Sequence, residues 1–296
     1  MMQINGTPMY SEVASSEGEG NPGAGGPPVL MLHGGFCSLE SLQPQADALV
    51  AAGRTVYGFE RPGHGRTPDH EGGYSYERSL EDTVAYLDAQ QLPPVDVIGY
   101  SDGAILGLLL AMRHPERVNS LVSISANLDP SGFTDTGSEA TPGQIILPPL
   151  PGSPVAGDSS VADASDPAHP AATPTEPQDT YLGAAAEEPN DPDLEGLAYA
   201  RLSPDGPGHA EAVLEKLFTL WRTQPDIDPA QLAGVHTRTL IMAGDRDSIR
   251  LDHSALIAAS LPNARLSIVG GTTHGLVNQK PELLSVIIAD FLTGDA

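Results

Sequence analysis

The sequence predicts an α/β protein in which helices cover both faces of a mostly parallel sheet. Short apolar segments alternate with amphipathic segments over residues 29–126, and the same alternation resumes over residues 239–292. Strands that alternate with helices of roughly 10–15 residues are typical of a parallel sheet. Between these halves, residues 129–193 are rich in Pro, Ala, Asp, Ser, Thr and Gly, which bury too little apolar surface to offset the entropy lost on ordering. We therefore expect one core, formed by both halves and interrupted by an insertion.

The first half supplies the elements of this sheet in a regular order. Residues 2–14 are predicted to form a hairpin that turns on Asn5-Gly6, a pair that favours a tight turn between antiparallel strands. Residues 15–28 are mostly Ser, Glu, Gly and Pro, and we expect a flexible excursion there. The pattern of apolar residues then predicts strands at 29–33, 54–60, 95–98 and 118–126, and helices at 38–52, 76–90 and 104–112.

The second half completes the core and follows the end of the insertion. We expect the core to comprise residues 1–128 and 235–296, with residues 129–234 as the insertion. Within the insertion, 129–193 is expected to be poorly structured and 194–224 to be helical. The second half of the core is predicted to contain strands at 239–243 and 265–269 and helices at 252–261 and 281–292.

The charge of the chain is strongly one-sided. It has 39 acidic residues against 14 basic ones, a formal net charge of −25, and Lys216 and Lys280 are its only lysines. Such a surface repels nucleic acids and anionic membranes, so we expect neither as a partner. The acidic residues are scattered along the chain, which favours a solvating surface of the kind seen in salt-adapted proteins over a site for cationic substrates.

Three further features bear on the compartment. No apolar run approaches the ~18 residues that a membrane-spanning helix requires. The first residues lack the basic start and the apolar stretch of a secretory signal peptide. Cys37 is the only cysteine, so no internal disulfide can form, and we expect this side chain to be a small packing residue. We expect a cytoplasmic protein.

The segment 95–112 holds the strongest candidate for a catalytic residue. The apolar run 95–98 precedes Gly99-Tyr-Ser-Asp-Gly103 and the apolar run 104–112 follows it, which places a Gly-x-Ser-x-Gly motif between a strand and a helix. A serine on such a strained turn needs neighbours without a Cβ atom, and the N-terminus of the next helix favours negative charge beside Ser101. The alternative is a Gly-rich turn that merely lets strand and helix pack closely.

Two later loops contain the groups that a serine nucleophile needs, a base that accepts its proton and an acid that orients the base. Asp245 and Asp247 follow one predicted strand, and His274 follows the next. Because parallel strands end at one edge of a sheet, we expect these side chains to lie near Ser101. Side chains two residues apart in an extended loop point the same way, so the pattern does not separate Asp245 from Asp247. A solvated loop histidine is the alternative for His274, and the required chain order of the three elements argues against it.

Together these motifs resemble the α/β-hydrolase superfamily over residues 1–128 and 235–296. The segment His33-Gly-Gly-Phe36 looks like the oxyanion loop of that family, and Arg61-Pro-Gly-His-Gly65 resembles its turn after the fourth strand. The resemblance implies an eight-stranded, mostly parallel sheet with helices on both faces and a cap insertion after the sixth strand.

A narrower resemblance points to the single-cap esterases around valacyclovir hydrolase. It is carried by Gly-Tyr-Ser-Asp-Gly-Ala at 99–104, His-Pro-Glu-Arg at 114–117 and Glu-Lys-Leu-Phe-Thr-Leu-Trp at 215–221. The chain departs from these esterases in 129–193, which lacks the helical pattern usual in their caps. Fold-level analogy is therefore a weak guide to the substrate.

The family resemblance assigns a role to each candidate. It makes Ser101 the nucleophile, His274 the general base and then the general acid, and Asp247 the orienting acid. Asp247 is preferred because the family motif is Gly-x-x-Asp, which matches Gly244 to Asp247. Asp245 is then expected to brace the loop.

The resemblance also places an oxyanion hole and a substrate pocket. The backbone N–H groups of Asp102 and of Gly35, or of Phe36, are expected to hold the oxyanion. The side chains expected to line the pocket are those of Phe36, Tyr100, Trp221 and Leu276. No metal-ligand spacing occurs in the sequence, and we expect neither a metal nor a cofactor.

The expected activity is hydrolysis of carboxylic esters of small molecules through an acyl-enzyme. A lactonase, thioesterase, C–C bond hydrolase or perhydrolase on the same triad stays open, because these differ in pocket shape. An alternative of another class is a non-catalytic ligand-binding protein of this fold. Haloalkane dehalogenases and epoxide hydrolases are disfavoured, since they use a carboxylate where this chain has Ser101. The oligomeric state is left open.

Overall fold

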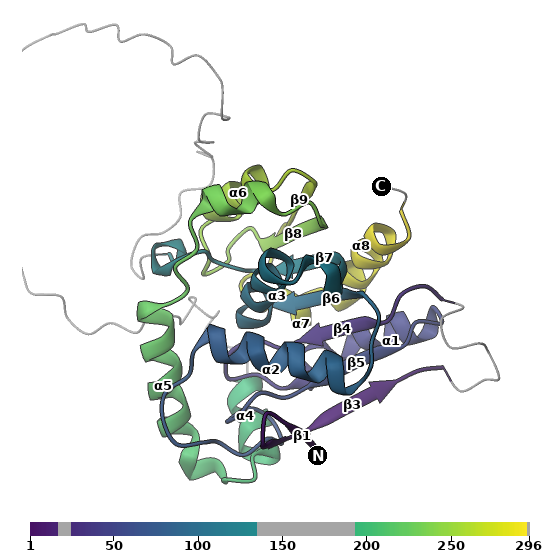
Figure 1. The fold of residues 1–296 in the computed structure, drawn as a ribbon. Helices are drawn as coiled ribbons and strands as arrows, with labels where there is room; N and C mark the ends of the chain where they lie inside the picture. Colours follow the sequence, from purple (N-terminus) through teal and green to yellow (C-terminus); the bar gives the residue numbers. More distant parts are fainter. Residues whose placement is uncertain (17–24, 135–192, 295–296) are drawn as a thin grey trace, which may run out of the picture.

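The computed structural model describes residues 1–16, 25–134 and 193–294, in which a seven-stranded sheet lies between two layers of helices (Figure 1). The strand order is β3-β5-β4-β6-β7-β8-β9, and every neighbouring pair is parallel except β3 with β5. The strands are β3 (Ser11–Ala14), β4 (Val29–Leu32), β5 (Val56–Phe59), β6 (Val95–Tyr100), β7 (Val118–Ile124), β8 (Arg238–Gly244) and β9 (Ala264–Val269). The predicted class, a mostly parallel α/β sheet, is confirmed.

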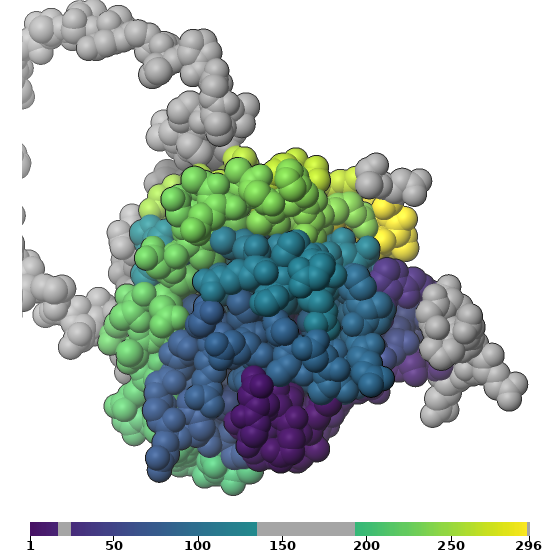
Figure 2. Space-filling model, in the orientation of Figure 1, coloured from purple at the N-terminus to yellow at the C-terminus, as the bar shows by residue number. Residues whose placement is uncertain are grey.

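The number of strands differs from the expected eight. Strands β1 (Met2–Ile4) and β2 (Thr7–Met9) pair only with each other, across the Asn5-Gly6 turn that the sequence predicts. This hairpin lies against the helix at residues 76–89, where Asn5 Nδ2 donates to Asp82 Oδ1 at 2.8 Å, and Figure 2 shows the two side by side. The chain joins the main sheet only at β3, so the insertion follows the fifth strand of that sheet in chain order, not the sixth.

The helices form two layers, as Figure 1 shows. Helices α1, α7 and α8 pack on one face of the sheet, and α2, α3 and α6 on the other. The α-helices are α1 (Gln43–Ala51), α2 (Tyr76–Ala89), α3 (Asp102–Arg113), α4 (Leu194–Leu202), α5 (Ala210–Thr223), α6 (Leu251–Ser260), α7 (Leu276–Gln279) and α8 (Pro281–Thr293). Short 3₁₀ helices are η1 (Leu39–Leu42), η2 (Pro115–Arg117), η3 (Pro130–Gly132), η4 (Pro207–His209) and η5 (Pro229–Gly234).

Local sequence explains why the central elements form where they do. In β4, Val29 and Met31 pack towards the α1 and α8 layer, while Leu30 and Leu32 pack towards α2 and α3, so a continuous apolar run fills both faces. Helix α2 begins after Ser75, whose hydroxyl accepts a hydrogen bond from the backbone N–H group of Arg78. Helix α3 is buried along nearly its whole length because it packs on β4, β6 and β7 and also contacts α2. These central elements hold the strand ends that carry the site in fixed positions.

The insertion is described at its two ends. Residues 130–132 form η3, and Phe133 makes a β-bridge with Ile249. Residues 135–192, for which the sequence predicts little regular structure, lie outside the described residues. Helices α4 and α5 follow, and α5 buries one face made of Val213, Leu217 and Leu220. Within the described part of the chain, no helix is both long and apolar enough to cross a lipid bilayer.

Candidate active site

Three loops at one edge of the sheet carry the candidate residues. Ser101 follows β6, Asp247 lies in the loop after β8, and His274 lies in the loop after β9. Strands β6 to β9 are neighbours in the sheet and run parallel, so their carboxyl ends lie at the same edge. The structure thus brings together residues that are up to 173 positions apart in the chain.

The turn at Ser101 has the strained geometry that the sequence predicts. Ser101 has φ 53° and ψ −118°, a conformation that costs of order 1–3 kcal/mol in a residue with a side chain. Its backbone N–H donates to the carbonyl of Ile124 on β7 at 2.8 Å. A Cβ atom on Gly99 would lie 2.2 Å from the Gly103 carbonyl oxygen, and one on Gly103 would lie 2.0 Å from that of Leu32. Only glycine therefore allows β6, α3 and β4 to approach this closely around the serine.

A continuous hydrogen-bonded line joins Ser101, His274 and Asp247. His274 Nε2 lies 3.0 Å from Ser101 Oγ, and His274 Nδ1 lies 2.7 Å from Asp247 Oδ1. An ionised carboxylate only accepts hydrogen bonds, so Nδ1 carries a proton and Nε2 is left to accept the serine proton. This is the arrangement in which a neutral imidazole can act as a general base.

Burial and charge shift the pKa values of Asp247 and His274 in opposite directions. Burial alone would raise the pKa of Asp247, yet the charge of His274 and the hydrogen bonds to it hold that pKa below the usual value for an aspartate. Burial would lower the pKa of His274, but the Asp247 carboxylate raises it above the usual value for a histidine. Each group therefore stabilises the charged form of the other.

Asp245 and Asp247, which the sequence pattern does not separate, occupy different environments. The Asp247 side chain is fully buried and faces His274. Asp245 is exposed, and its carboxylate accepts hydrogen bonds from the backbone of Gly271 and Thr272 in the loop before His274, which lowers its pKa. The tight turn after β8 points the two side chains in different directions.

Asp247 also has a partner that the sequence analysis missed. The hydroxyl of Ser125, the residue after β7, donates to Asp247 Oδ2 at 2.5 Å. Ser125 has a positive φ of 58° and is 1% exposed. No local motif marks this serine, because its contact with Asp247 spans 122 residues.

The candidate oxyanion loop, residues 33–36, is held in place by the buried side chain of Arg61. The Arg61 guanidinium donates to the carbonyl oxygens of His33 at 2.8 Å and of Gly34 at 2.9 Å. His33 Nε2 in turn accepts the backbone N–H of Arg61 at 3.1 Å. The segments around 33–36 and 61–65, both identified in the sequence, therefore brace each other and fix the backbone next to Ser101.

The side chain of Asp102 connects this loop to two helices. Its Oδ1 accepts hydrogen bonds from the Tyr76 hydroxyl and from Trp221 Nε1, both at 2.8 Å, and Arg61 Nη2 lies 4.0 Å from its Oδ2. Gly35 packs directly against Asp102 and Trp221. Tyr76 and Arg61 were not among the expected site residues: Arg61 was noted only as part of the 61–65 turn, and Tyr76 stands in no motif.

The four expected pocket residues differ in burial: two are half-buried and two are buried. Phe36 and Trp221 are half-buried, and Phe36 stacks on Tyr199 of α4 with ring centroids 4.9 Å apart. Tyr100 is buried, and its hydroxyl donates to the His274 carbonyl at 3.0 Å. Leu276 is fully buried in the apolar cluster between the sheet and α8. Trp221 is therefore the one that the structure places beside both Gly35 and Asp102, and Phe36 follows Gly35 in the same loop.

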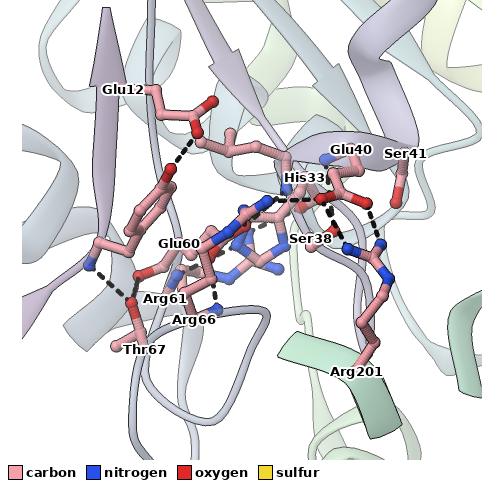
Figure 3. A network of polar contacts seen from close by, with 12 residues as sticks. Glu12, His33, Ser38, Glu40, Ser41, Glu60, Arg61, Arg66, Thr67 and Arg201 are labelled. Atoms are coloured by element: carbon pink, nitrogen blue, oxygen red, sulfur yellow. Dashed lines mark hydrogen bonds and ion pairs between the residues drawn. The ribbon is translucent and has the colours of Figure 1, made fainter. Parts of the chain in front are cut away.

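Helix α4 is joined to the core by a chain of ion pairs, drawn in Figure 3. Glu60, at the end of β5, is fully buried and pairs with Arg66 at 2.8 Å. Arg66 also pairs with Glu40, and Glu40 pairs with Arg201 on α4. Beside this chain, Glu195 of α4 accepts a hydrogen bond from the hydroxyl of Ser41, and burial raises its pKa.

The fold and this site together define a class of protein, and the chain belongs to the α/β-hydrolase fold family, whose model matches residues 27–281. Among curated proteins, it is 34% identical to rhodomycin D methylesterase DauP from Streptomyces sp. (strain C5). The 119 aligned residues cover 38% of this chain and 39% of that protein. It is also 34% identical over 124 residues to the uncharacterized hydrolase YcgS from Bacillus subtilis (strain 168), 42% of this chain and 43% of that protein. The matches thus span about two fifths of the length of these relatives.

Solved structures share the fold over nearly the whole chain. The enol-lactonase from Burkholderia xenovorans LB400 superposes with a TM-score of 0.68 and covers 99% of both chains. An esterase (EaEST) from Exiguobacterium antarcticum gives a TM-score of 0.68 over 99% of this chain and 98% of its own. Sequence identity is 16% and 18%, so these likenesses concern the fold alone.

Proposed function

We propose that this protein is a serine hydrolase that cleaves carboxylic esters of small molecules through an acyl-enzyme intermediate. The observation that carries the proposal is the line from Ser101 Oγ to His274 Nε2 at 3.0 Å and from His274 Nδ1 to Asp247 Oδ1 at 2.7 Å. A nucleophile, a base and an orienting acid in hydrogen-bond contact are what serine-based acyl transfer requires. The methylesterase among the partial relatives supports ester bonds as the target.

In the proposed reaction, Ser101 Oγ attacks the ester carbonyl carbon while His274 Nε2 accepts the serine proton. The tetrahedral oxyanion is stabilised by the backbone N–H groups of Asp102 and of Gly35 or Phe36. The C–O bond of the ester then breaks, and His274 gives its proton to the departing alcohol. Water enters, loses a proton to His274 and attacks the carbonyl carbon of the acyl-enzyme. The bond from this carbon to Ser101 Oγ then breaks and His274 returns the proton to Oγ, which releases the carboxylic acid and restores Ser101.

We further propose that residues 129–234 act as a cap on a core formed by residues 1–128 and 235–296. Support comes from α4 and α5, which contact the loop beside Ser101. Tyr199 of α4 stacks on Phe36, and Trp221 of α5 packs against Gly35. The roof of the substrate site would then be built from these two helices.

The test is a comparison of the wild-type protein with Ser101→Ala. We expect the wild type to hydrolyse p-nitrophenyl esters and to react with a fluorophosphonate probe, and Ser101→Ala to lose both activities while its circular dichroism spectrum stays unchanged. The panel should cover several acyl lengths, a lactone and a thioester, so that preference among them identifies the bond attacked. Labelling that persists in Ser101→Ala would point to another nucleophile and overturn the assignment.

A further inference from the structure

Ser125 occupies a strained position between the strand of the nucleophile and the strand of the acid. Ser125 comes directly after β7, which lies between β6 and β8 in the sheet. Its backbone N–H donates to the carbonyl of Met242 on β8 at 2.8 Å, while the preceding carbonyl, of Ile124, accepts the N–H of Ser101. At φ 58°, Ser125 adopts a left-handed conformation that is uncommon for residues other than glycine, asparagine and aspartate.

This conformation directs the serine hydroxyl onto the carboxylate of Asp247. Asp247 Oδ1 accepts from His274 Nδ1 at 2.7 Å and from the backbone N–H of Ile249 at 3.0 Å. Asp247 Oδ2 accepts from Ser125 Oγ at 2.5 Å and from the backbone N–H of Gly244 at 3.2 Å. Among the described residues, Ser125 therefore makes the shortest contact to Oδ2, at a carboxylate that is fully buried.

We propose that Ser125 is a positioning residue for the catalytic acid, a role that rests on the function proposed above. Its hydroxyl fixes the rotation of the Asp247 carboxylate, so that Oδ1 stays aligned with His274 Nδ1 while the imidazole gains and loses a proton. A backbone turn alone would be satisfied better by glycine, which adopts positive φ without a steric cost. The hydrogen bond to Asp247 is thus the physical reason for a serine at this strained position.

Two substitutions separate this role from a purely structural one. Ser125→Gly removes the hydroxyl and relieves the backbone, whereas Ser125→Ala removes the hydroxyl and keeps the strain. We expect kcat for a p-nitrophenyl ester to fall about 10–100-fold in both variants, the rate loss that corresponds to one hydrogen bond to a charged group. KM should stay near the wild-type value, and Ser125→Gly should melt at or above the temperature of Ser125→Ala.

Ser123→Ala is the matched control. Ser123 lies two residues earlier on β7, is fully buried, and its hydroxyl has no hydrogen-bond partner among the described residues. This variant removes the same hydroxyl oxygen from the strand that leads to Ser125 without touching Asp247, so we expect it to keep the wild-type kcat.

The rate of fluorophosphonate labelling supplies a second readout that does not depend on the ester chosen. Slower labelling in both Ser125 variants, with normal labelling in Ser123→Ala, supports the positioning role. If no ester in the panel is cleaved, that absence of hydrolysis overturns only the proposed substrate. Wild-type kcat and labelling rate in Ser125→Gly would overturn the positioning role and leave the proposed function intact. A wild-type protein that neither labels nor hydrolyses would overturn both.

Discussion

At the scale of single residues, the site depends on how one buried carboxylate is surrounded. Within the part of the chain that the structure describes, Asp247 receives four hydrogen bonds, from His274, Ser125 and the backbone N–H groups of Gly244 and Ile249. These donors and the charge of His274 offset the burial that would otherwise raise the pKa of the carboxyl group. A carboxylate kept ionised in this way can orient the imidazole and stabilise it when it is protonated.

The different surroundings of Asp247 and Asp245 lead to a prediction. Asp247→Asn removes the negative charge that faces His274 and favours the wrong tautomer, and we expect kcat to fall by several orders of magnitude, on the order of 10⁴ in the serine proteases. Asp245→Asn should lose far less, because the Asp245 carboxylate accepts hydrogen bonds from the backbone of Gly271 and Thr272, whereas the carboxylate that binds His274 Nδ1 is that of Asp247. Both variants should be assayed on one ester at saturating concentration. The opposite ranking would exchange the two roles, and small equal losses would place the acid elsewhere.

At the scale of elements, α4 and α5 are each attached to the core by polar contacts. Trp221 ties α5 to the first residue of α3 through its hydrogen bond to Asp102. The chain from Glu60 through Arg66 and Glu40 ties α4 to the end of β5. Arg66 belongs to the loop after β5 and Glu40 to η1, so α4 is attached to the core through both of these segments.

The buried end of this chain should matter most for stability. Glu60 accepts hydrogen bonds from the backbone N–H groups of Leu39 and Arg66 besides its ion pair, and its side chain is fully buried. We expect Glu60→Ala to lower the free energy of unfolding by about 3 kcal/mol, the lower end of the range for a broken buried pair, because Arg66 is 25% exposed and keeps access to water. Urea denaturation followed by circular dichroism measures this change.

Glu77→Ala provides the comparison on the surface. Glu77 pairs with Arg113, and both side chains are more than half exposed. Exposed pairs contribute roughly 0–1 kcal/mol, so this variant should unfold almost like the wild type. Equal losses in Glu60→Ala and Glu77→Ala would show that burial does not set the strength of the Glu60 contacts.

At the scale of the whole molecule, the net charge of −25 opposes the compact state through repulsion among its own carboxylates. Salt screens charges at the surface over about 8–10 Å at moderate ionic strength. We therefore predict that the melting temperature rises with NaCl, by roughly 2–4 °C for each kcal/mol of repulsion removed in a domain of about 150–250 residues. Differential scanning calorimetry between low and molar NaCl measures it, and a flat or falling melting temperature would contradict the salt-adaptation interpretation.

The sequence by itself determined the features that local patterns encode. Apolar runs such as 29–32 mark strands buried on both faces, and the glycines of Gly99–Gly103 mark a turn that no larger residue fits. Asn5-Gly6 specified its hairpin because two residues suffice to define that turn. In the same way, chain order alone placed Ser101 and His274 at one edge of a parallel sheet.

Only the tertiary structure decided the features that depend on contacts between distant segments. The direction of a side chain in a tight turn separates Asp247 from Asp245. Strand β3 pairs with β5 and not with the β1–β2 hairpin, so the main sheet of the described residues has seven strands. Ser125 gains its contact with Asp247 only when β7 lies beside β8, 122 residues apart in the chain. Local sequence sets backbone preferences over a few residues, whereas these contacts exist only once the sheet has brought its strands together.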